Sequence, residues 1–249
     1  MVRLTDKVAV KYWAAEQLGA DWVTPTLWQG TDLPAAPDWP LPFVVKASHG
    51  CRQHAFVRTG EEDWKAIRRS ARRWTRKPYG RWLDEWAYGG IRPGLLVEPF
   101  IGTDGVLPID YKFFVFAGRV RFIQVHLERE NAHRWLLFDR EWRRVSARTA
   151  DPDPKSPIAL DRMIAAAEKL GRGFAFVRVD LYSVDGQPRF GEMTFYPGSG
   201  LDPFAPASLD ARLGRHWRTA LEQASPPTHR QAHRQPSRGR FGAGAPSRA

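Results

Sequence analysis

Two neighbouring strand patterns near the C-terminus carry four polar side chains within an otherwise apolar alternation. Residues 174–183 and 188–195 alternate aromatic or aliphatic residues with others, and the Asp185-Gly186 pair between them predicts a tight turn. The four polar residues are Arg178 and Asp180 on the first strand and Glu192 and Thr194 on the second. Because residues two apart on a strand point to the same face, each strand presents its polar pair on one surface.

The length of the turn decides whether the two pairs meet. A two-residue turn would place Asp180 and Glu192 on opposite faces of the hairpin. A three-residue turn, residues 184–186, instead sets Arg178 across from Glu192 with Asp180 alongside, and this is the geometry that we expect. The surface then holds two carboxylates, an arginine and a hydroxyl, the groups that a magnesium-nucleotide phosphate site needs. A polar hairpin face that only contacts water is the alternative.

Length and composition indicate a globular protein without a membrane span. With 249 residues, of which 43% are hydrophobic, the chain can form one domain or two closely joined lobes. No apolar run approaches the length of a membrane span, and charges interrupt the first eleven positions, so no signal peptide is predicted. We therefore expect a cytoplasmic protein. Cys51 is the single cysteine, which excludes an intramolecular disulfide framework and a cysteine-rich zinc site.

The net charge of +11 is unevenly distributed. Residues 224–249 contain five arginines and no acid among Pro, Gly, Ser and Gln, a composition that predicts a disordered basic tail. Such a tail fits contact with nucleic acid or an anionic membrane, and a solvated extension is the alternative. A predicted helix over residues 61–76 is also rich in arginine, and here too a solvated face is the alternative to an anionic partner.

Only 8 of the 38 basic residues are lysines, so a lysine inside a strand pattern is notable. Residues 41–47 form a buried strand pattern that is interrupted by Lys46. The turn that follows contains His49 and Gly50, and backbone amides in such a turn can point at phosphate oxygens. Strand, lysine, glycine-containing turn and strand together predict a hairpin that covers phosphates.

Further charges lie on other predicted elements. An apolar strand over residues 94–101 has Glu98 near its end, and Asp110 and Lys112 share one face of the next strand by period-two spacing. An N-terminal helix carries Lys7 in its first turn, where the helix dipole does not favour a cation. The apolar positions of this helix are Val8, Tyr12, Ala15 and Leu18, with Val10 and Ala14 nearby.

The order of these features resembles the ATP-grasp superfamily. The resemblance rests on these motifs: the helix start D-K, the strand F-V-V-K before the glycine turn, L-L-V-E, D-Y-K-F-F-V-F-A-G, and R-V-D with F-G-E-M-T-F-Y-P-G-S-G. Within the superfamily, the last two motifs look like the group named for the teichuronopeptide biosynthesis protein TupA. The similarity runs from about Leu4 to about Gly214. It implies an α+β fold of two lobes whose antiparallel sheets grip ATP between them.

Carried over position by position, the resemblance also implies roles for individual residues. Asp180 and Glu192 match the Mg2+ ligands, and Thr194 stands where most members carry a ligating asparagine. Arg178 matches the arginine that steadies the γ-phosphate and the acyl phosphate. Lys7 and Lys46 match the cations that bind the phosphates of the nucleotide, and the His49-Gly50 turn matches the loop that covers them. Glu98 lies in the adenine hinge, and Asp110 matches the acid that holds the ribose hydroxyls. Lys112 faces the same way as Asp110 and is expected to reach a phosphate or the acyl substrate.

The sequence departs from the family pattern in two places. Related sequences read H-G-S-G where this chain has His49-Gly50-Cys51-Arg52, so we expect a stiffer loop in which Arg52 supplies charge in place of backbone contacts. The N-terminal lobe that often precedes the ATP site is also expected to be missing. The expected organisation is a helix and connecting segment (1–40), a small ATP-grasp lobe (41–100), a large lobe with the metal site (101–223) and the basic tail (224–249).

Three functions agree with these observations. The leading hypothesis is an ATP-dependent ligase that joins a small-molecule or glycan-linked carboxylate to an amine or related nucleophile through an acyl phosphate, in cell-surface polysaccharide or peptide-polymer assembly. The second keeps the ATP site but transfers the γ-phosphate to a sugar or glycan hydroxyl, as a kinase does. The third is a non-catalytic, basic nucleic-acid-binding protein, which lacks a recognisable recognition motif.

Overall fold

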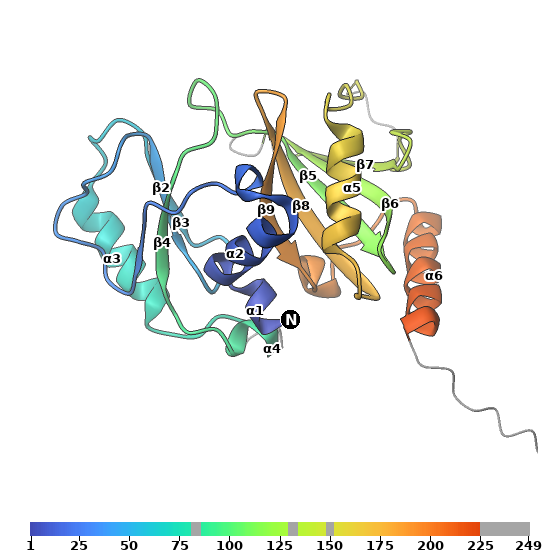
Figure 1. The fold of residues 1–249 in the computed structure, drawn as a ribbon, viewed down its shortest axis with the longest axis horizontal. Helices are drawn as coiled ribbons and strands as arrows, with labels where there is room; N and C mark the ends of the chain where they lie inside the picture. Colours follow the sequence, from blue (N-terminus) through green and yellow to red (C-terminus); the bar gives the residue numbers. More distant parts are fainter. Residues whose placement is uncertain (81–85, 129–133, 148–151, 225–249) are drawn as a thin grey trace, which may run out of the picture.

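The computed structural model describes residues 1–80, 86–128, 134–147 and 152–224. Two antiparallel sheets stand side by side and are linked by helices near the N-terminus, as Figure 1 shows. The predicted α+β class is thus confirmed. Within the described residues, no helix is both long enough and apolar enough to cross a membrane. The predicted basic tail, apart from Ala224, lies outside the described residues.

The small lobe is built on a four-stranded sheet with the order β1-β4-β2-β3. The strands are β1 (Trp28–Gly30), β2 (Phe43–Ala47), β3 (His54–Val57) and β4 (Leu95–Pro99). Helix α3 (Trp64–Thr75) covers the outer face (Figure 1), where Phe43, Val45 and Val97 form a core with Ala71 of the helix. Phe43 and Val45 alternate with Val44 and Lys46, so Lys46 is turned toward the opposite face, the one nearer the large lobe.

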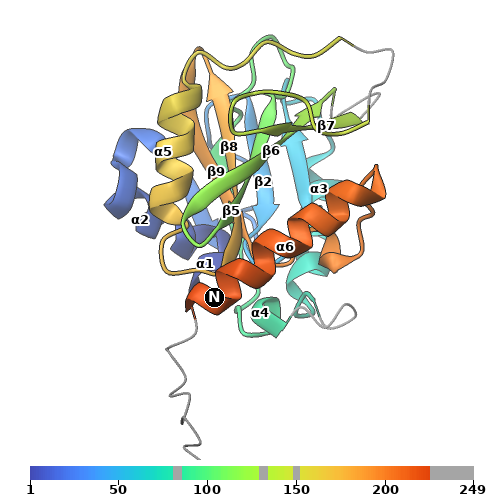
Figure 2. The same cartoon turned by 90° about the vertical axis from the view of Figure 1, so that its right-hand side faces the viewer.

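The large lobe is built on a five-stranded sheet with the order β7-β6-β5-β8-β9. The strands are β5 (Asp110–Phe116), β6 (Arg119–Leu127), β7 (Arg134–Asp139), β8 (Phe176–Val184) and β9 (Gln187–Thr194). Helix α5 (Leu160–Leu170) lies on one face of the sheet, and α6 (Ala207–Ala224) crosses the other (Figures 1 and 2). β5 is the central strand of this sheet and is buried along its whole length.

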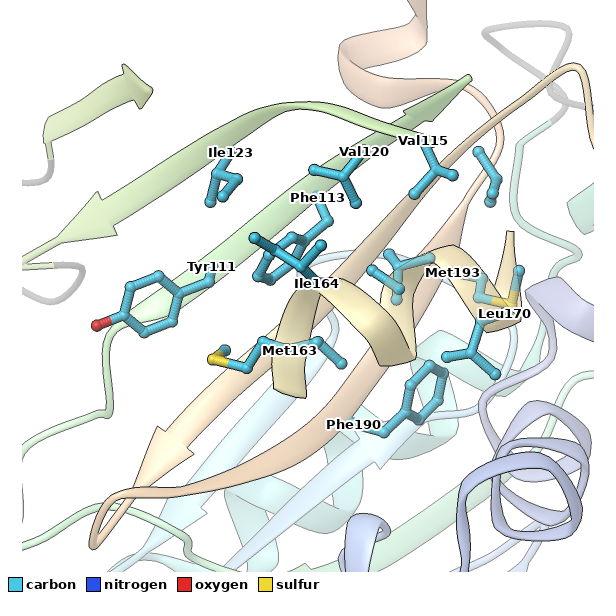
Figure 3. Close-up of a cluster of buried hydrophobic side chains, with 14 of the residues drawn as sticks. Tyr111, Phe113, Val115, Val120, Ile123, Met163, Ile164, Leu170, Phe190 and Met193 are labelled. Carbon is cyan, nitrogen blue, oxygen red and sulfur yellow. The ribbon is translucent and has the colours of Figure 1, made fainter. Parts of the chain in front are cut away.

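Alternation along β5 divides the large lobe into two sides. Tyr111, Phe113 and Val115 pack with Met163 and Ile164 of α5, as Figure 3 shows. The other side of β5 carries the residues Asp110, Lys112, Phe114 and Phe116. Of these, the two phenylalanines pack under α6. The charged residues thus lie on the same sheet face as α6, at the end of β5 that the helix does not cover.

The N-terminal segment is shared between the two lobes. Helices α1 (Val2–Thr5) and α2 (Lys7–Leu18) are followed by the turn η1 (Ala20–Trp22), whereas β1 of the same segment joins the small-lobe sheet. The Asp6 side chain caps α2 by accepting hydrogen bonds from two backbone amides. Val10 and Ala14 pack into the large-lobe core, while Tyr12 is 61% exposed. The apolar face predicted for this helix was therefore wrong in part, because Val10, Lys11 and Ala14 point inward.

Two short elements complete the described chain. They are α4 (Trp86–Gly89), which precedes β4, and η2 (Pro197–Gly200), which follows β9. Gly198, Ser199 and Gly200 all have positive φ angles, so the chain turns tightly as it leaves the metal-ligand candidates of β9.

Candidate functional site

The turn between β8 and β9 differs from the prediction. Asp185 and Gly186 form a two-residue turn with φ angles of 50° and 73°, and Val184 pairs with Gln187. Positive φ at both central positions is typical of the type I′ turn that suits the twist of a hairpin. The expected three-residue turn was therefore wrong, and a regular ladder from this turn would have put Asp180 and Glu192 on opposite faces.

A β-bulge restores the shared face. Leu181 pairs with Phe190, but Asp180 pairs with Glu192, so Gly191 is an extra residue on β9. A Cβ atom at Gly191 would lie 3.0 Å from the Asp180 carbonyl oxygen, which is why glycine fits this position. An isolated glycine inside a strand pattern is a recognised signal of a bulge, so the sequence did contain the information.

The bulge also changes which residues face each other. Arg178 lies across from Thr194, not from Glu192 as predicted, because the register after the bulge differs from that of a three-residue turn. The Arg178 Nη2 donates to Thr194 Oγ1 over 3.0 Å and is 3.6 Å from Glu192 Oε1. All four polar residues are consequently brought together at the edge of the large-lobe sheet that faces α2 (Figure 1).

Asp180 is the buried centre of this cluster. Arg178 donates to both of its carboxylate oxygens, Nε to Oδ1 and Nη2 to Oδ2, each over 2.7 Å. Lys112 Nζ also donates to Asp180 Oδ2 over 2.5 Å and lies 2.7 Å from Asp110 Oδ2. The Asp180 side chain is 1% exposed, so two cations and two acids from two neighbouring strands, β5 and β8, share one buried network.

Burial and charge act against each other in this network. Burial alone would raise the pKa of the Asp180 carboxyl, but Arg178 and Lys112 outweigh it and lower that pKa to about 2. Burial lowers the pKa of Lys112, but the charges of Asp180 and Asp110 together raise it by more, so its pKa lies above the ordinary value. The same balance keeps the pKa of Arg178 raised. All three groups are charged at neutral pH.

Glu192 is the carboxylate that opens toward solvent. Its side chain is 31% exposed, and its oxygens lie 3.6 Å from Arg178 Nη2 and 4.0 Å from Lys7 Nζ, beyond direct hydrogen-bond distance. Neither cation therefore occupies the carboxylate, and a ligand can reach it.

The donor set fits a magnesium ion that arrives with phosphates. Asp180 accepts three hydrogen bonds out of about four that a carboxylate can accept, which leaves room for one more bond. Glu192 is open, and Thr194 adds a hydroxyl. In the described parts of the chain, no three His, Cys, Asp or Glu side chains are grouped to hold a metal by themselves. Mg2+ is commonly bound by one or two carboxylates together with phosphate oxygens and water, which is what this set can offer.

Lys7 links this cluster to the turn between β2 and β3. Its Nζ donates to the Gly50 carbonyl over 2.5 Å, and its backbone N–H donates to the Ser48 carbonyl over 3.0 Å. The first turn of α2 therefore lies between the small-lobe turn and Glu192. Its ammonium group donates to the Gly50 carbonyl and lies 4.0 Å from the Glu192 carboxylate, which explains why a lysine is tolerated at a helix start.

His49 does not face the site. The ring is 0% exposed, its Nε2 lies 3.1 Å from the Trp74 carbonyl, and its Nδ1 accepts from the Gly94 amide. Both nitrogens are therefore engaged by the backbone, with the proton on Nε2. The predicted direct contact of His49 with a nucleotide has no support in this geometry, and the side chain instead ties the turn to α3 and the chain before β4.

On the small-lobe side, Glu98 joins two lysines. Lys46 Nζ donates to Glu98 Oε2 over 2.6 Å, and Lys11 Nζ donates to Glu98 Oε1 and, over 2.8 Å, to Thr26 Oγ1. Burial raises the pKa of Glu98, but the charges of Lys46 and Lys11 outweigh this effect and lower it. Lys11 was not predicted as a site residue. Its spacing of four from Lys7, which places both on one helix face, was the available signal.

A cavity of about 840 Å3 lies between the lobes and joins these groups. Nine of the predicted site residues line it, and the two that do not are His49 and the buried Asp180. Apolar residues from the small lobe and the β4–β5 connection line another part, among them Val44, Leu96, Phe100 and Leu107. Arg52, whose φ of 56° is unusual for a residue with a side chain, also lines the cavity. The size is typical of a pocket for a cofactor-sized ligand.

Comparisons with known proteins place this geometry in a family. A family model described as TupA-like ATPgrasp matches residues 1–218. Similar solved structures include D-alanine–D-alanine ligase from Bacillus anthracis complexed with ATP, with a TM-score of 0.47 and 14% identity over 89% of this chain and 64% of that one. Another is L-amino acid ligase from Bacillus licheniformis, with a TM-score of 0.51 and 14% identity over 80% of this chain and 44% of that one.

A third similar structure is D-alanine–D-alanine ligase from Helicobacter pylori, with a TM-score of 0.47 and 16% identity over 90% of this chain and 61% of that one. The chain thus spans less than two thirds of the length of each of these three proteins. At these identities the likeness concerns the fold. A comparison with curated protein sequences gave no match.

Proposed function

The chain belongs to the TupA-like ATP-grasp family, and we propose that it is an ATP-dependent ligase that joins a carboxylate to an amine or related nucleophile. The observation that carries the proposal is the cavity in which the open carboxylate of Glu192 meets the cations Arg178, Lys7 and Lys46. Clustered cations with a metal-binding carboxylate suit a triphosphate. A hydrolase that acts on an uncharged substrate, or a protein that only binds nucleic acid, does not need these groups together.

The lining of the cavity supports one orientation of ATP. The apolar part around Val44, Leu96 and Phe100 suits the adenine ring, with Glu98 in the chain segment beside it. Lys46 and Lys7 are placed for phosphate oxygens, and the backbone of Gly50 lies over the same region. We assign the ribose hydroxyls to Asp110. His49 contributes only by holding the turn in place.

The reaction would proceed in two displacements. A carboxylate oxygen of the substrate attacks the γ-phosphorus of ATP and ADP leaves, which yields an acyl phosphate. The amine then attacks the acyl carbon, the carbon–oxygen bond breaks and inorganic phosphate leaves, and the nitrogen loses a proton to give the amide. Mg2+, when bound, neutralises phosphate charge, and Glu192 and Asp180, with Thr194, would hold it.

The protein's own cations act on the transferring group. Arg178 is fixed by its two bonds to Asp180, so its remaining N–H groups are pre-oriented toward charge that develops on the phosphoryl oxygens. Lys112 is held by two carboxylates and stays protonated, and we assign it to the same phosphoryl group or to the acyl oxygen. Because both cations are positioned before the substrate binds, little reorganisation is needed during transfer.

The family name supports a setting in cell-surface polymer assembly. We propose that the acid is a small molecule or a glycan-linked carboxylate, that the acceptor is an amine or related nucleophile, and that the reaction takes place in the cytoplasm. The amino acid ligases among the similar structures agree with amide formation but do not specify these substrates.

Phosphate release in the presence of a panel of acids and amines tests this function. The expected result is ATP-dependent release of phosphate only when an acid and an amine are both present, with an amide product in the mass spectrum. A stable phosphorylated product without an amine would instead identify a kinase. Absence of Mg-ATP binding by calorimetry would contradict both assignments.

A further inference from the structure

Lys11 is a buried cation that no step of the proposed reaction uses. It lies on α2, whose neighbouring residues Val10 and Ala14 pack into the large-lobe core. Its Nζ nevertheless reaches across to Glu98 of the small-lobe strand β4 and to Thr26, in the connection before β1. Burial lowers the pKa of Lys11 and Glu98 opposes this effect, so the carboxylate is what makes a charged lysine tolerable here.

Glu98 therefore lies between two lysines that differ in exposure. Each carboxylate oxygen accepts from one ammonium group, Oε1 from Lys11 and Oε2 from Lys46. All three residues line the cavity, but the side chain of Lys46 is 32% exposed, whereas those of Lys11 and Glu98 are 10% and 8% exposed. Lys46 can turn toward a ligand. Lys11 cannot move away from the carboxylate, because its buried charge would then be left without a partner.

The charge balance of this triad decides how Lys46 can act. With both lysines present, the group carries one surplus positive charge, and the surplus lies on the exposed side at Lys46. Without Lys11, Lys46 would be the sole cation on a buried carboxylate, and a phosphate would have to compete with Glu98 for it.

We propose that Lys11 is a positioning residue that balances the charge of Glu98 and so keeps Lys46 available for a phosphate oxygen of the nucleotide. The inference rests on the proposed ATP site, because it gives Lys46 its ligand. The positioning role requires that the effect of Lys11 on nucleotide affinity depends on the charge of Glu98. A lysine that only stabilised the fold would not show this dependence.

A double-mutant cycle tests this dependence, with Mg-ATP binding measured by calorimetry. Lys11→Met should weaken binding about tenfold, because Glu98 then holds Lys46. In the Lys11→Met, Glu98→Gln double variant, the competing charge is gone, and most of the affinity should return. Adenosine, which has no phosphate, should bind the wild type and Lys11→Met alike. Lys65→Met, an exposed change on α3 that removes the same charge, is the matched control.

The outcomes separate the two levels of the proposal. If the wild-type protein does not bind Mg-ATP, the proposed function fails. If it binds but Lys11→Met binds equally well, or the double variant stays as weak as Lys11→Met, the positioning role is wrong. Should Lys11→Met fail to fold, the double variant is compared with Glu98→Gln alone, since neither has a carboxylate at position 98. A difference of more than about threefold between those two would then overturn the inference.

Discussion

Asp180 lies directly opposite Glu192 across the β8–β9 ladder although the turn between the strands has only two residues. In a regular ladder from this turn, Gly191 would lie opposite Asp180, but the ladder accommodates Gly191 as a bulge. The way in which one residue of an edge strand is accommodated thus determines whether the two candidate Mg2+ ligands share a face.

Deletion of Gly191 should leave the ligands together. Without the extra residue, the ladder from the two-residue turn is regular, and Glu192 follows Phe190 directly and still pairs with Asp180. We therefore expect Mg-ATP turnover within about tenfold of the wild type. Gly191→Ala keeps the residue count. Its Cβ would lie 3.0 Å from the Asp180 carbonyl oxygen, so we expect a stability loss of about 1 kcal/mol with turnover largely retained. A loss of turnover on the order of 100-fold in the deletion variant would show that the bulge itself, and not only the pairing of Asp180 with Glu192, is needed.

Replacement of Glu192 by Gln tests the accessible carboxylate. We expect turnover of Mg-ATP to fall by about 100-fold or more, because an amide oxygen is a poor substitute for a charged ligand. The melting temperature should change little, since the neighbouring cations lie 3.6 and 4.0 Å away and do not depend on this group. Glu222→Gln, an exposed change on α6, serves as control. Wild-type turnover by Glu192→Gln would remove Glu192 from the site.

Arg52 allows side-chain and backbone effects to be separated. Its φ of 56° suits glycine, and the residue lines the cavity. If the guanidinium contacts phosphate, Arg52→Gly and Arg52→Ala should both bind Mg-ATP about tenfold more weakly and bind adenosine unchanged. The Gly variant should be about 1 kcal/mol more stable than the Ala variant, because it relieves the left-handed backbone. Unchanged ATP affinity in Arg52→Gly would show that only the loop backbone matters.

The lowered pKa of Asp180 predicts an acid-dependent loss of stability. The unfolded chain binds a proton at this position near the ordinary value of 3.8, whereas the folded protein does so only near about 2. The ion pairs therefore stabilise the fold fully above about pH 5, by about 2 kcal/mol, and this contribution is lost as the pH falls from about 4 toward 2.

Urea unfolding of the wild type and Asp180→Asn between pH 3 and 7 measures this contribution. The variant should be less stable at neutral pH, because Arg178 and Lys112 lose their buried partner, and the difference should shrink below about pH 4. A difference that stays constant across the whole range would mean that Asp180 does not titrate as its contacts indicate.

Much of the fold could be predicted from local pattern. The strand with Asp110 and Lys112 and the hairpin with its two polar pairs both follow from residue periodicity, which depends only on neighbouring positions. The same periodicity misjudged α2, where Tyr12 is exposed and Lys11 is buried. A buried lysine is favourable only because Glu98, 87 residues further on, offers it a carboxylate.

What the sequence by itself determined about the hairpin is its two strands, its turn and its four polar side chains. Only the tertiary structure decided how these groups meet, because ladder register depends on where one extra residue is accommodated between the strands. Tertiary contacts likewise turned His49 away from the cavity, toward the backbone of Trp74 and Gly94. A local pattern states which chemical groups a strand carries, whereas their partners come from distant parts of the chain that only the folded packing brings within hydrogen-bond distance.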